Sequence, residues 1–166
     1  MPDSIEEIQV KGMAVLADKL SDYEPQGLVD AQFSTQWAIA MMVLGVDPGP
    51  EWCSEERLRD PQALDLAGKV KCEVDPDADR LWLEEGKQIA TVEIAMKDGK
   101  RISGYVEYPK GELANPFTPD EIRETFRRLA SYVLKPKEIE RILETVDELE
   151  TVDDISKLAD MLRPYS

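Results

Sequence analysis

Alternating hydrophobic and polar residues predict strands in the first two thirds of the chain. The segment from Ile5 to Val10 alternates in this way and predicts a strand that reaches or passes Gly12. Its polar positions suit a half-exposed edge of a sheet. Residues 70–74 alternate as well, and two further alternating runs flank Asp98 and Gly99, which is a strong signal for a β-hairpin.

Helical periodicity takes over in the remaining segments. The run "DAQFSTQWAIAMMVLGVDPG", residues 30–49, predicts a helix that ends near Gly45. Because its apolar part has no polar side, we expect this helix to be buried on most sides. Two short helices should follow, one capped by Ser54 and one that starts at Asp60 and Pro61 and ends at Gly68.

The last third of the chain predicts three helices. "TPDE", residues 118–121, carries a capping Thr, a first-turn Pro and a capping-box Glu. A second helix should begin near Pro136 and a third after residue 154. The sequence therefore predicts an α+β fold, in which a small antiparallel sheet with a β-hairpin is packed by helices and followed by a C-terminal helical arm. We expect an α+β domain over residues 1–133 and the arm over residues 134–166.

Charge and composition narrow the range of partners. The chain of 166 residues has 20 Lys and Arg against 35 Asp and Glu, a formal charge of −15. This charge opposes attraction to nucleic acid or to anionic lipid, so neither is an expected partner. The N-terminal stretch has no basic and apolar leader and no segment is apolar enough to span a membrane, which favours a cytoplasmic location. Cys53 and Cys72 have no metal or redox spacing and are expected to be thiols.

The residues also argue against several common kinds of site. The chain contains no His, so an imidazole base or ligand would have to come from another chain. Glycine-rich nucleotide loops and the Gly-x-Ser-x-Gly elbow are absent. "DPDAD", residues 75–79, imitates the start of a calcium loop, but Arg80 and Gly86 stand where that loop needs Gly and Glu. We expect a solvated turn there and no metal.

Two stretches remain as candidates for ligand contact. The first turn of the predicted helix, Gln32 to Gln36, offers backbone N–H groups that suit a carboxylate, although Ser34 or Asp30 as a simple N-cap explains the same pattern. Lys110 follows a strand in "YPKGELANPFTPDE" and presents a cation at a sheet edge, although a plain strand-to-helix connector has the same turn chemistry. The spacing alone leaves both alternatives open.

Several motifs in a fixed order resemble the C-terminal part of the MmgE/PrpD family, which includes 2-methylcitrate dehydratase, cis-aconitate decarboxylase and iminodisuccinate epimerase. They are "SIEEIQVKG", "DAQFSTQWAIAMMVLG", "LRDPQALDLAGKVKCEVDPDAD" and "ATVEIAMKDGKRISGYVEYPKGELANPFTPDEIRETFRRLAS", which cover nearly the whole chain. The resemblance implies an α+β lid domain of a two-part protein. Its helical other part supplies most acid and base groups, and no organic cofactor is used.

The resemblance implies a lyase or isomerase that acts on small di- or tricarboxylates by dehydration, decarboxylation or epimerisation. This chain would need a separate helical subunit for catalysis and would be inactive alone. The implied substrate-binding residues are Gln32, Phe33, Ser34 and Trp37, and we add Lys110. Trp37 replaces a usual Tyr, which removes a phenolic hydroxyl and argues against proton transfer there. The alternatives are a non-catalytic module that binds a carboxylate or a protein, and a structural homodimer.

Overall fold

The computed structural model describes residues 2–163 and divides into two compact units, Met1–Ala114 and Asn115–Ser166. The first unit holds the sheet and the second contains only helices. This arrangement confirms the predicted α+β class. The expected boundary between residues 133 and 134 lies inside the second unit, between its first two α-helices, and stays a prediction as a domain boundary.

Four strands form the sheet of the first unit. They are β1 (Ile5–Gly12), β2 (Val70–Val74), β3 (Ala90–Met96) and β4 (Arg101–Val106), in the order β2-β1-β3-β4. The pairs β1–β3 and β3–β4 are antiparallel, as predicted, and β3–β4 is the expected hairpin with Gly99 at a φ of +86° in its turn. The pair β1–β2 is parallel, so the sheet is mixed. A long helical crossover joins these two strands, and such a crossover permits parallel pairing.

The position of β1 corrects one expectation. This strand lies between β2 and β3, not at an edge, and it ends at Gly12. Its polar side chains point to the open face of the sheet, and a period of two cannot distinguish that face from an edge. A Cβ on Gly12 would stand 2.7 Å from Cδ1 of Leu16, so the bare Gly12 backbone leaves room for this side chain of the helix that follows.

The two faces of the sheet differ sharply in chemistry. One face carries apolar rows that cross all four strands, such as Val70, Ile8, Ile94 and Ile102. The other face carries polar rows such as Lys71, Gln9, Glu93 and Ser103. Ion pairs Lys71–Glu7, Lys11–Glu73 and Arg101–Glu93 cross this second face. One face therefore belongs to the core and the other is open.

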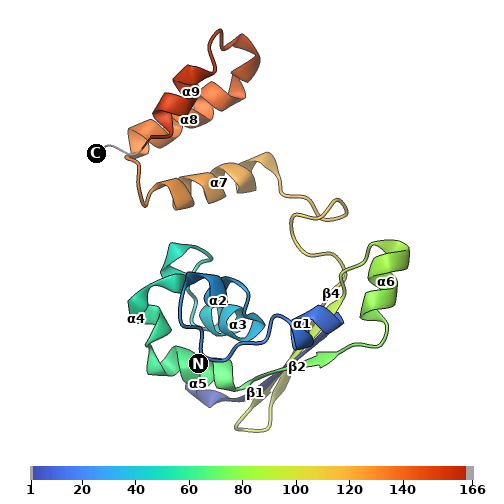
Figure 1. The fold of residues 1–166 in the computed structure, drawn as a ribbon. Coiled ribbons are helices and arrows are strands. Elements are labelled where there is room, and N and C mark those ends of the chain that lie inside the picture. Colours follow the sequence, from blue (N-terminus) through green and yellow to red (C-terminus); the bar gives the residue numbers. More distant parts are fainter. Residues whose placement is uncertain (1, 164–166) are drawn as a thin grey trace. The chain divides into compact units, whose positions relative to one another are not determined.

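Short helices cover the apolar face on the side of β1 and β2, and α2 to α5 gather together beside the strands (Figure 1). The helices of the first unit are η1 (Pro2–Ser4), α1 (Ala14–Asp18), α2 (Leu28–Gln32), α3 (Thr35–Val43), η2 (Pro50–Cys53), α4 (Glu55–Leu58), α5 (Pro61–Gly68) and α6 (Ala78–Glu85). The core contains Ile8 and Val70 of the sheet with Trp37, Met41 and Leu66 of α3 and α5. Ser54 and Asp60 cap α4 and α5, as predicted.

Helix α6 was not expected from the sequence. The acidic run of residues 75–79, predicted as a solvated turn, extends into the first turn of α6, and its carboxylates have structural partners. Oδ1 of Asp75 accepts a hydrogen bond from the N–H of Asp77 at 2.9 Å, and the carboxylate of Asp79 accepts from the N–H of Ala14 at 3.3 Å. The acidic run thus forms a turn and caps α1, which a search for calcium ligands does not reveal.

The second unit contains α7 (Pro119–Ala130), α8 (Pro136–Asp147), η3 (Leu149–Thr151) and α9 (Ser156–Met161), in agreement with the three predicted helices. Thr118 and Glu121 form the predicted capping box of α7. Ion pairs join α7 to α8, among them Arg123–Asp147 at 2.5 Å and a two-pronged Arg127–Glu140 pair at 2.7 and 3.1 Å. Packing and charge together hold this helical pair.

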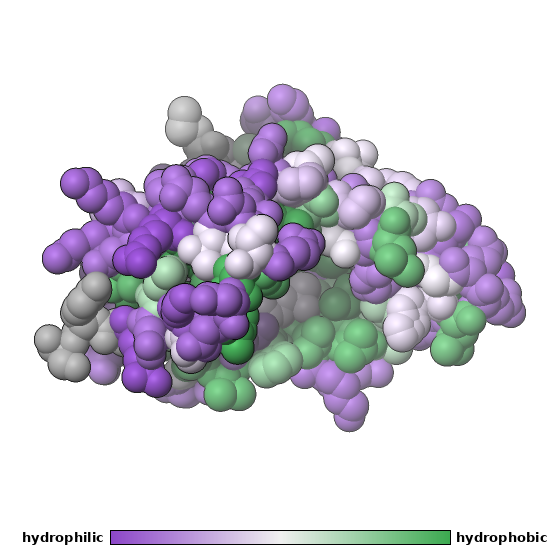
Figure 2. Space-filling view, turned by 90° about the horizontal axis from the view of Figure 1, so that it is seen from above, coloured by the Kyte–Doolittle hydropathy of each residue, from purple (hydrophilic) through white to green (hydrophobic). Residues whose placement is uncertain are grey.

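Hydrophilic residues cover much of the face seen in Figure 2, with hydrophobic residues between them. Cys53 and Cys72 are both free thiols, as expected. Within residues 2–163, no helix combines the length and the apolar character that crossing a membrane requires.

Candidate functional site

The candidate site lies where one predicted helix is divided into two. Helix α2 ends at Gln32 and α3 begins at Thr35, so Phe33 and Ser34 form a corner between them. Ser34 has an extended backbone and its Oγ accepts a hydrogen bond from the N–H of Trp37 at 2.9 Å. The sequence left Ser34 and Asp30 as alternative N-caps, and in the structure Ser34 is the N-cap of α3. We call Gln32 to Trp37 the α2–α3 corner.

Buried hydrogen bonds connect the corner to the preceding loop. The hydroxyl of Ser34 donates to the backbone oxygen of Asp22, and the amide of Gln36 accepts from the N–H of Asp22 at 3.1 Å. Nε2 of Gln36 donates to Oγ of Ser21 at 2.8 Å, and the N–H of Thr35 donates to the oxygen of Leu20 at 2.8 Å. Because Ser34 and Gln36 are at most 2% exposed, these bonds fix the corner from inside.

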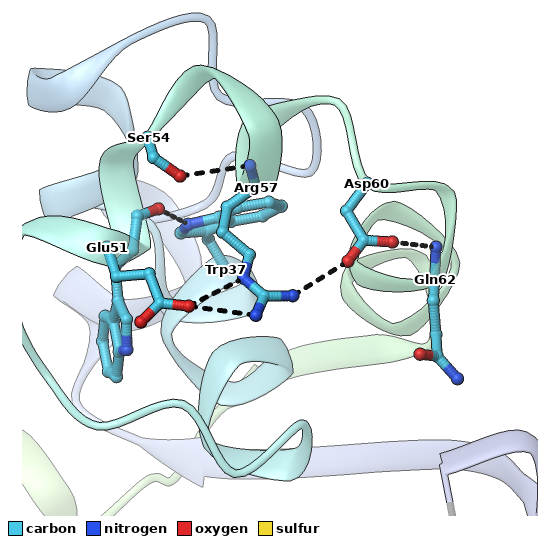
Figure 3. A network of polar contacts seen from close by, with 7 residues as sticks. Trp37, Glu51, Ser54, Arg57, Asp60 and Gln62 are labelled. Carbon is cyan, nitrogen blue, oxygen red and sulfur yellow. Dashed lines mark hydrogen bonds and ion pairs between the residues drawn. The ribbon is translucent and has the colours of Figure 1, made fainter.

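Trp37 anchors the other side of the corner. Its side chain is 0% exposed, and its indole N–H donates to the backbone oxygen of Trp52 at 2.8 Å (Figure 3). The indole of Trp52 donates in turn to the oxygen of Val46 at 3.0 Å. The pair of indoles therefore ties α3 to the segment 46–52.

A salt-bridge cluster begins within this segment and continues into α4 and α5. Arg57 contacts Glu51 at 3.0 Å and Asp60 at 3.1 Å, while Asp60 caps α5 through the N–H of Gln62 (Figure 3). Hydrogen bonding to Glu51 raises the pKa of Arg57 above its ordinary value. The cluster joins η2, α4 and α5 into one support for Trp52 and hence for the corner.

Two hollows border the corner. The larger, about 600 Å³, is mainly apolar and is lined by Leu28, Ala31, Gln32, Ala38, Gly49, Pro50, Trp52 and Cys53. The smaller, about 260 Å³, is lined by Lys19, Ser21, Asp22, Val29, Asp30 and Phe33. Of the four corner residues predicted to bind substrate, Gln32 and Phe33 reach these hollows, and Phe33 is 59% exposed. Ser34 and Trp37 are buried behind them, and their direct contact with substrate stays a prediction.

The charges around the corner are mostly negative. Lys19 lines the smaller hollow together with Asp22 and Asp30, whose carboxylates accept backbone N–H groups of Glu24 and Gln26 at 2.9 and 3.1 Å. At the start of α3, the N–H groups of Thr35 and Trp37 already donate within the fold. The corner alone therefore offers little positive potential to a dicarboxylate.

Lys110 lies elsewhere in the first unit. It is exposed in the turn after β4, where Gly111 has a φ of +103°. It lines neither hollow of the corner. A third hollow, about 730 Å³, lies near this turn and is lined by α6 and residues 108–114, with Trp82, Tyr108 and Glu112 among its lining residues. The structure thus gathers four of the five predicted residues at the corner and leaves Lys110 apart from them.

The second unit contributes a separate apolar groove of about 330 Å³ between α7 and α8. Its lining residues are Pro119, Ile122, Arg123, Phe126, Ile142, Leu143, Val146 and Asp147. Ile122 and Val146 are 57% and 48% exposed. Exposed apolar surface of this kind usually marks an interface.

The sequence interpretation missed several residues that line the hollows beside the α2–α3 corner. Lys19, Trp52 and Cys53 reach the two hollows only because the fold brings their segments beside α2. Burial raises the pKa of the Cys53 thiol, which disfavours its reactive thiolate form. The only sequence signal for Trp52 was an aromatic residue inside a Pro- and Gly-rich turn, and that signal has no specific meaning on its own.

Comparison with known proteins gives this fold a family. The family model for the MmgE/PrpD C-terminal domain matches residues 1–151. A cis-aconitate decarboxylase-like protein of Aspergillus oryzae is 35% identical over 105 residues, which are 60% of this chain and 21% of that protein. The cis-aconitate decarboxylases of Mus musculus and Homo sapiens are 29% and 27% identical, over 84% and 81% of this chain and 28% and 27% of their own length.

The chain therefore spans less than a third of the length of each of these relatives. The match nevertheless extends from β1 through α8, so it includes the sheet, the α2–α3 corner and the groove of the second unit. It confirms the resemblance that the motifs indicated. The chain belongs to the MmgE/PrpD family, and the part of that family it matches is the C-terminal domain.

Proposed function

We propose that this chain is the lid-type part of a lyase or isomerase that acts on small di- or tricarboxylates, and that it works with a separate helical subunit. One observation carries the proposal: residues 1–151 match the family's C-terminal domain, while the 166 residues contain no His. Proton abstraction beside a carboxylate needs a group that titrates near neutral pH, usually His. We assign that group to the helical subunit. The names of the relatives suggest a substrate like cis-aconitate.

The α2–α3 corner is the proposed substrate-facing wall. Gln32 offers an amide and Phe33 an exposed ring, and both stand on a backbone that Ser34, Gln36 and Trp37 hold from inside. A wall fixed in this way positions a ligand without moving when it binds. We propose that Lys110 joins the site only in the assembled enzyme.

The charge of the chain supports a role for a second subunit. A tricarboxylate carries several negative charges, and this chain carries −15. Lys19 at the corner stands beside two carboxylates. Apart from Lys110, the cations that hold the substrate should therefore come from the helical subunit. The groove between α7 and α8 is the surface we propose for docking that subunit, because its apolar lining is exposed.

Affinity isolation of the tagged chain from its native cell tests this proposal. We expect a helical, His-containing polypeptide of the same family to co-purify, and the complex to convert cis-aconitate or a related carboxylate. Phe33→Ala should lower turnover without loss of the partner. Met42→Ala is the matched control, because Met42 is 57% exposed on α3 and lines neither corner hollow.

The same preparation separates the alternatives. Saturable binding of a tricarboxylate by the chain alone, lost in Lys110→Ala, would favour a binding module over a catalytic lid. A complex whose turnover is unchanged by Phe33→Ala and Gln32→Ala would remove the α2–α3 corner from the site.

A further inference from the structure

Strand β4 leaves one edge of the sheet uncovered. All six of its residues are exposed, and among residues 2–163 its one extensive neighbour is β3. The covering helices lie toward β2: along one apolar row the exposure rises from 0% at Val70 and Ile8 to 47% at Ile102. Edge strands are usually protected from pairing by a Pro or by a charged residue near their middle. Residues 101–106 contain neither.

The hairpin determines which residues of β4 direct their backbone N–H and C=O groups toward β3. The N–H of Met96 donates to the oxygen of Lys100 at 2.8 Å, so Lys100 faces β3. Backbone groups in a strand alternate in direction, so those of Ile102, Gly104 and Val106 also face β3. The N–H and C=O groups of Arg101, Ser103 and Tyr105 therefore point away from the sheet and are free to pair with another strand.

We propose that β4 pairs antiparallel with β4 of a second copy of this chain, about a two-fold axis at Gly104. This inference is independent of the proposed function. In such a pair, residues that stand opposite each other lie on the same face of the joined sheet. With the axis at Gly104, Ser103 stands opposite Tyr105 of the second copy, and Ile102 stands opposite Val106. The Ser103 and Tyr105 pairs exchange backbone hydrogen bonds through their outward groups. The four-stranded sheets of the two copies then join into one.

Side-chain chemistry favours a second copy over an unrelated peptide. The pairing brings Ile102 and Val106, which are 47% and 38% exposed, together on the apolar face. Ser103 meets Tyr105 on the polar face. One step further along, Arg101 stands opposite Glu107 of the second copy, which adds an opposite charge to the pairs that each already makes within its own chain, Arg101 with Glu93 and Glu107 with Lys87. Gly104 meets its own equivalent on the axis, where a Cβ added to it would meet no atom of its own chain within 4 Å.

The neighbouring register makes poorer pairs. An axis at Ser103 would place Ile102 opposite Gly104 and Arg101 opposite Tyr105, which removes both the apolar pair and the charge pair. The choice of axis can therefore be measured directly.

Cysteine cross-linking distinguishes the two registers. Opposing residues of a non-hydrogen-bonded pair have Cα atoms about 4.5 Å apart, a distance that a disulfide can span. Under mild oxidation, Gly104→Cys should give a disulfide-linked dimer on a non-reducing gel, and Ser103→Cys should give little more than the wild-type chain with its half-buried Cys53 and Cys72. Cross-linking of Ser103→Cys but not Gly104→Cys would contradict the axis at Gly104, and equal or no cross-linking of both would overturn the pairing.

Solution mass provides a second test that needs no oxidant. Ser103→Pro removes an outward N–H while leaving the bonds to β3 in place, and Ser103→Ala keeps that N–H as the matched control. By analytical ultracentrifugation, the wild type and Ser103→Ala should double in mass as concentration rises, and Ser103→Pro, folded by circular dichroism, should keep a single-chain mass. A wild type that stays at single-chain mass up to about 1 mM, where association is worth only about 4 kcal/mol, would overturn the proposal. So would a Pro variant that still dimerises.

Discussion

Single polar atoms decide the shape of the α2–α3 corner. Ser34 uses its hydroxyl twice, as an acceptor for the start of α3 and as a donor to the loop at Asp22. Trp37 uses its one polar atom to bind the chain at Trp52. Both residues are buried, so their contribution is to hold Gln32 and Phe33 in place. Changes at Ser34 and Trp37 should therefore act first on stability.

Replacing Ser34 with Ala should lower the free energy of unfolding by about 1–2 kcal/mol, because it removes an N-cap and leaves the oxygen of Asp22 without its donor. Ser54→Ala is the matched control, since Ser54 caps the shorter α4 through one bond of 3.3 Å and should cost about 0.5–1 kcal/mol. Urea denaturation measures both losses. Equal losses would show that the bond to Asp22 contributes nothing.

Trp37→Phe should destabilise the chain by about 2 kcal/mol or more, because it leaves the oxygen of Trp52 unpaired and opens a small cavity. Trp82→Phe, at a position 42% exposed on α6, should stay within about 0.5 kcal/mol of the wild type. Thermal or urea unfolding followed by circular dichroism compares the two variants. A Trp37→Phe variant as stable as the Trp82→Phe variant would contradict the anchoring role.

At the scale of elements, local signals predicted most helices and strands, while tertiary contacts decided the rest. The hairpin at Gly99 and the capping box at Thr118 depend on neighbouring residues and were predicted correctly. The central position of β1 and its parallel pairing with β2 depend on a distant segment, so the pattern of one strand did not reveal them. The break at Ser34 is stabilised by Asp22, twelve residues away in sequence, and a continuous helical pattern concealed it.

In the candidate site, too, some features could be predicted from the sequence and others depend on tertiary contacts. Gln32 to Trp37 were predicted from the family resemblance and do form one corner. Composition and spacing gave no sign that Ser34 and Trp37 point inward, or that Lys19 and Trp52 reach the neighbouring hollows. Those facts depend on how α2 packs on the segments around residues 20 and 50.

The ion pair between α7 and α8 makes a pH-dependent prediction. The bidentate contact with Arg127 lowers the pKa of Glu140, so the ionised carboxylate favours the folded pair. Its contribution should be complete above the ordinary Glu pKa of about 4.3 and should be lost as pH falls from there through the lowered value. Hydrogen-exchange protection of α8 in the full chain, measured relative to the intrinsic exchange rate at each pH, should fall over that range.

Glu140→Gln should remove this part of the pH dependence, because the amide does not titrate. Glu144→Gln is the matched control, since Glu144 lies on the same helix and has no ion-pair partner among residues 2–163. An identical pH response in Glu140→Gln and the wild type would assign the effect to other carboxylates.

At the scale of the whole molecule, exposed apolar side chains occur in both units and the chain carries a formal charge of −15. The groove between α7 and α8 and the edge at β4 lie in different units and suit different occupants. The groove is proposed for the helical subunit and the edge for a second copy of this chain. The absence of His leaves the proposed chemistry without its usual base until a partner supplies one.

A charge in the groove should release the helical subunit. Val146→Asp places a carboxylate on exposed apolar surface, where desolvation on docking is costly, so we expect at least a tenfold loss of co-purified partner, or about 1.4 kcal/mol. Leu83→Asp is the matched control, because Leu83 is 82% exposed on α6, outside the groove. Full retention of the partner by folded Val146→Asp would place the docking surface elsewhere.

The turnover of small carboxylates by the purified chain alone tests most directly whether this chain needs a separate helical subunit for catalysis. Cis-aconitate and related di- and tricarboxylates are incubated with the chain, and decarboxylation, dehydration and epimerisation products are quantified by NMR. We expect no conversion above the uncatalysed rate until the helical subunit is added. Robust turnover by the chain alone would contradict this expectation.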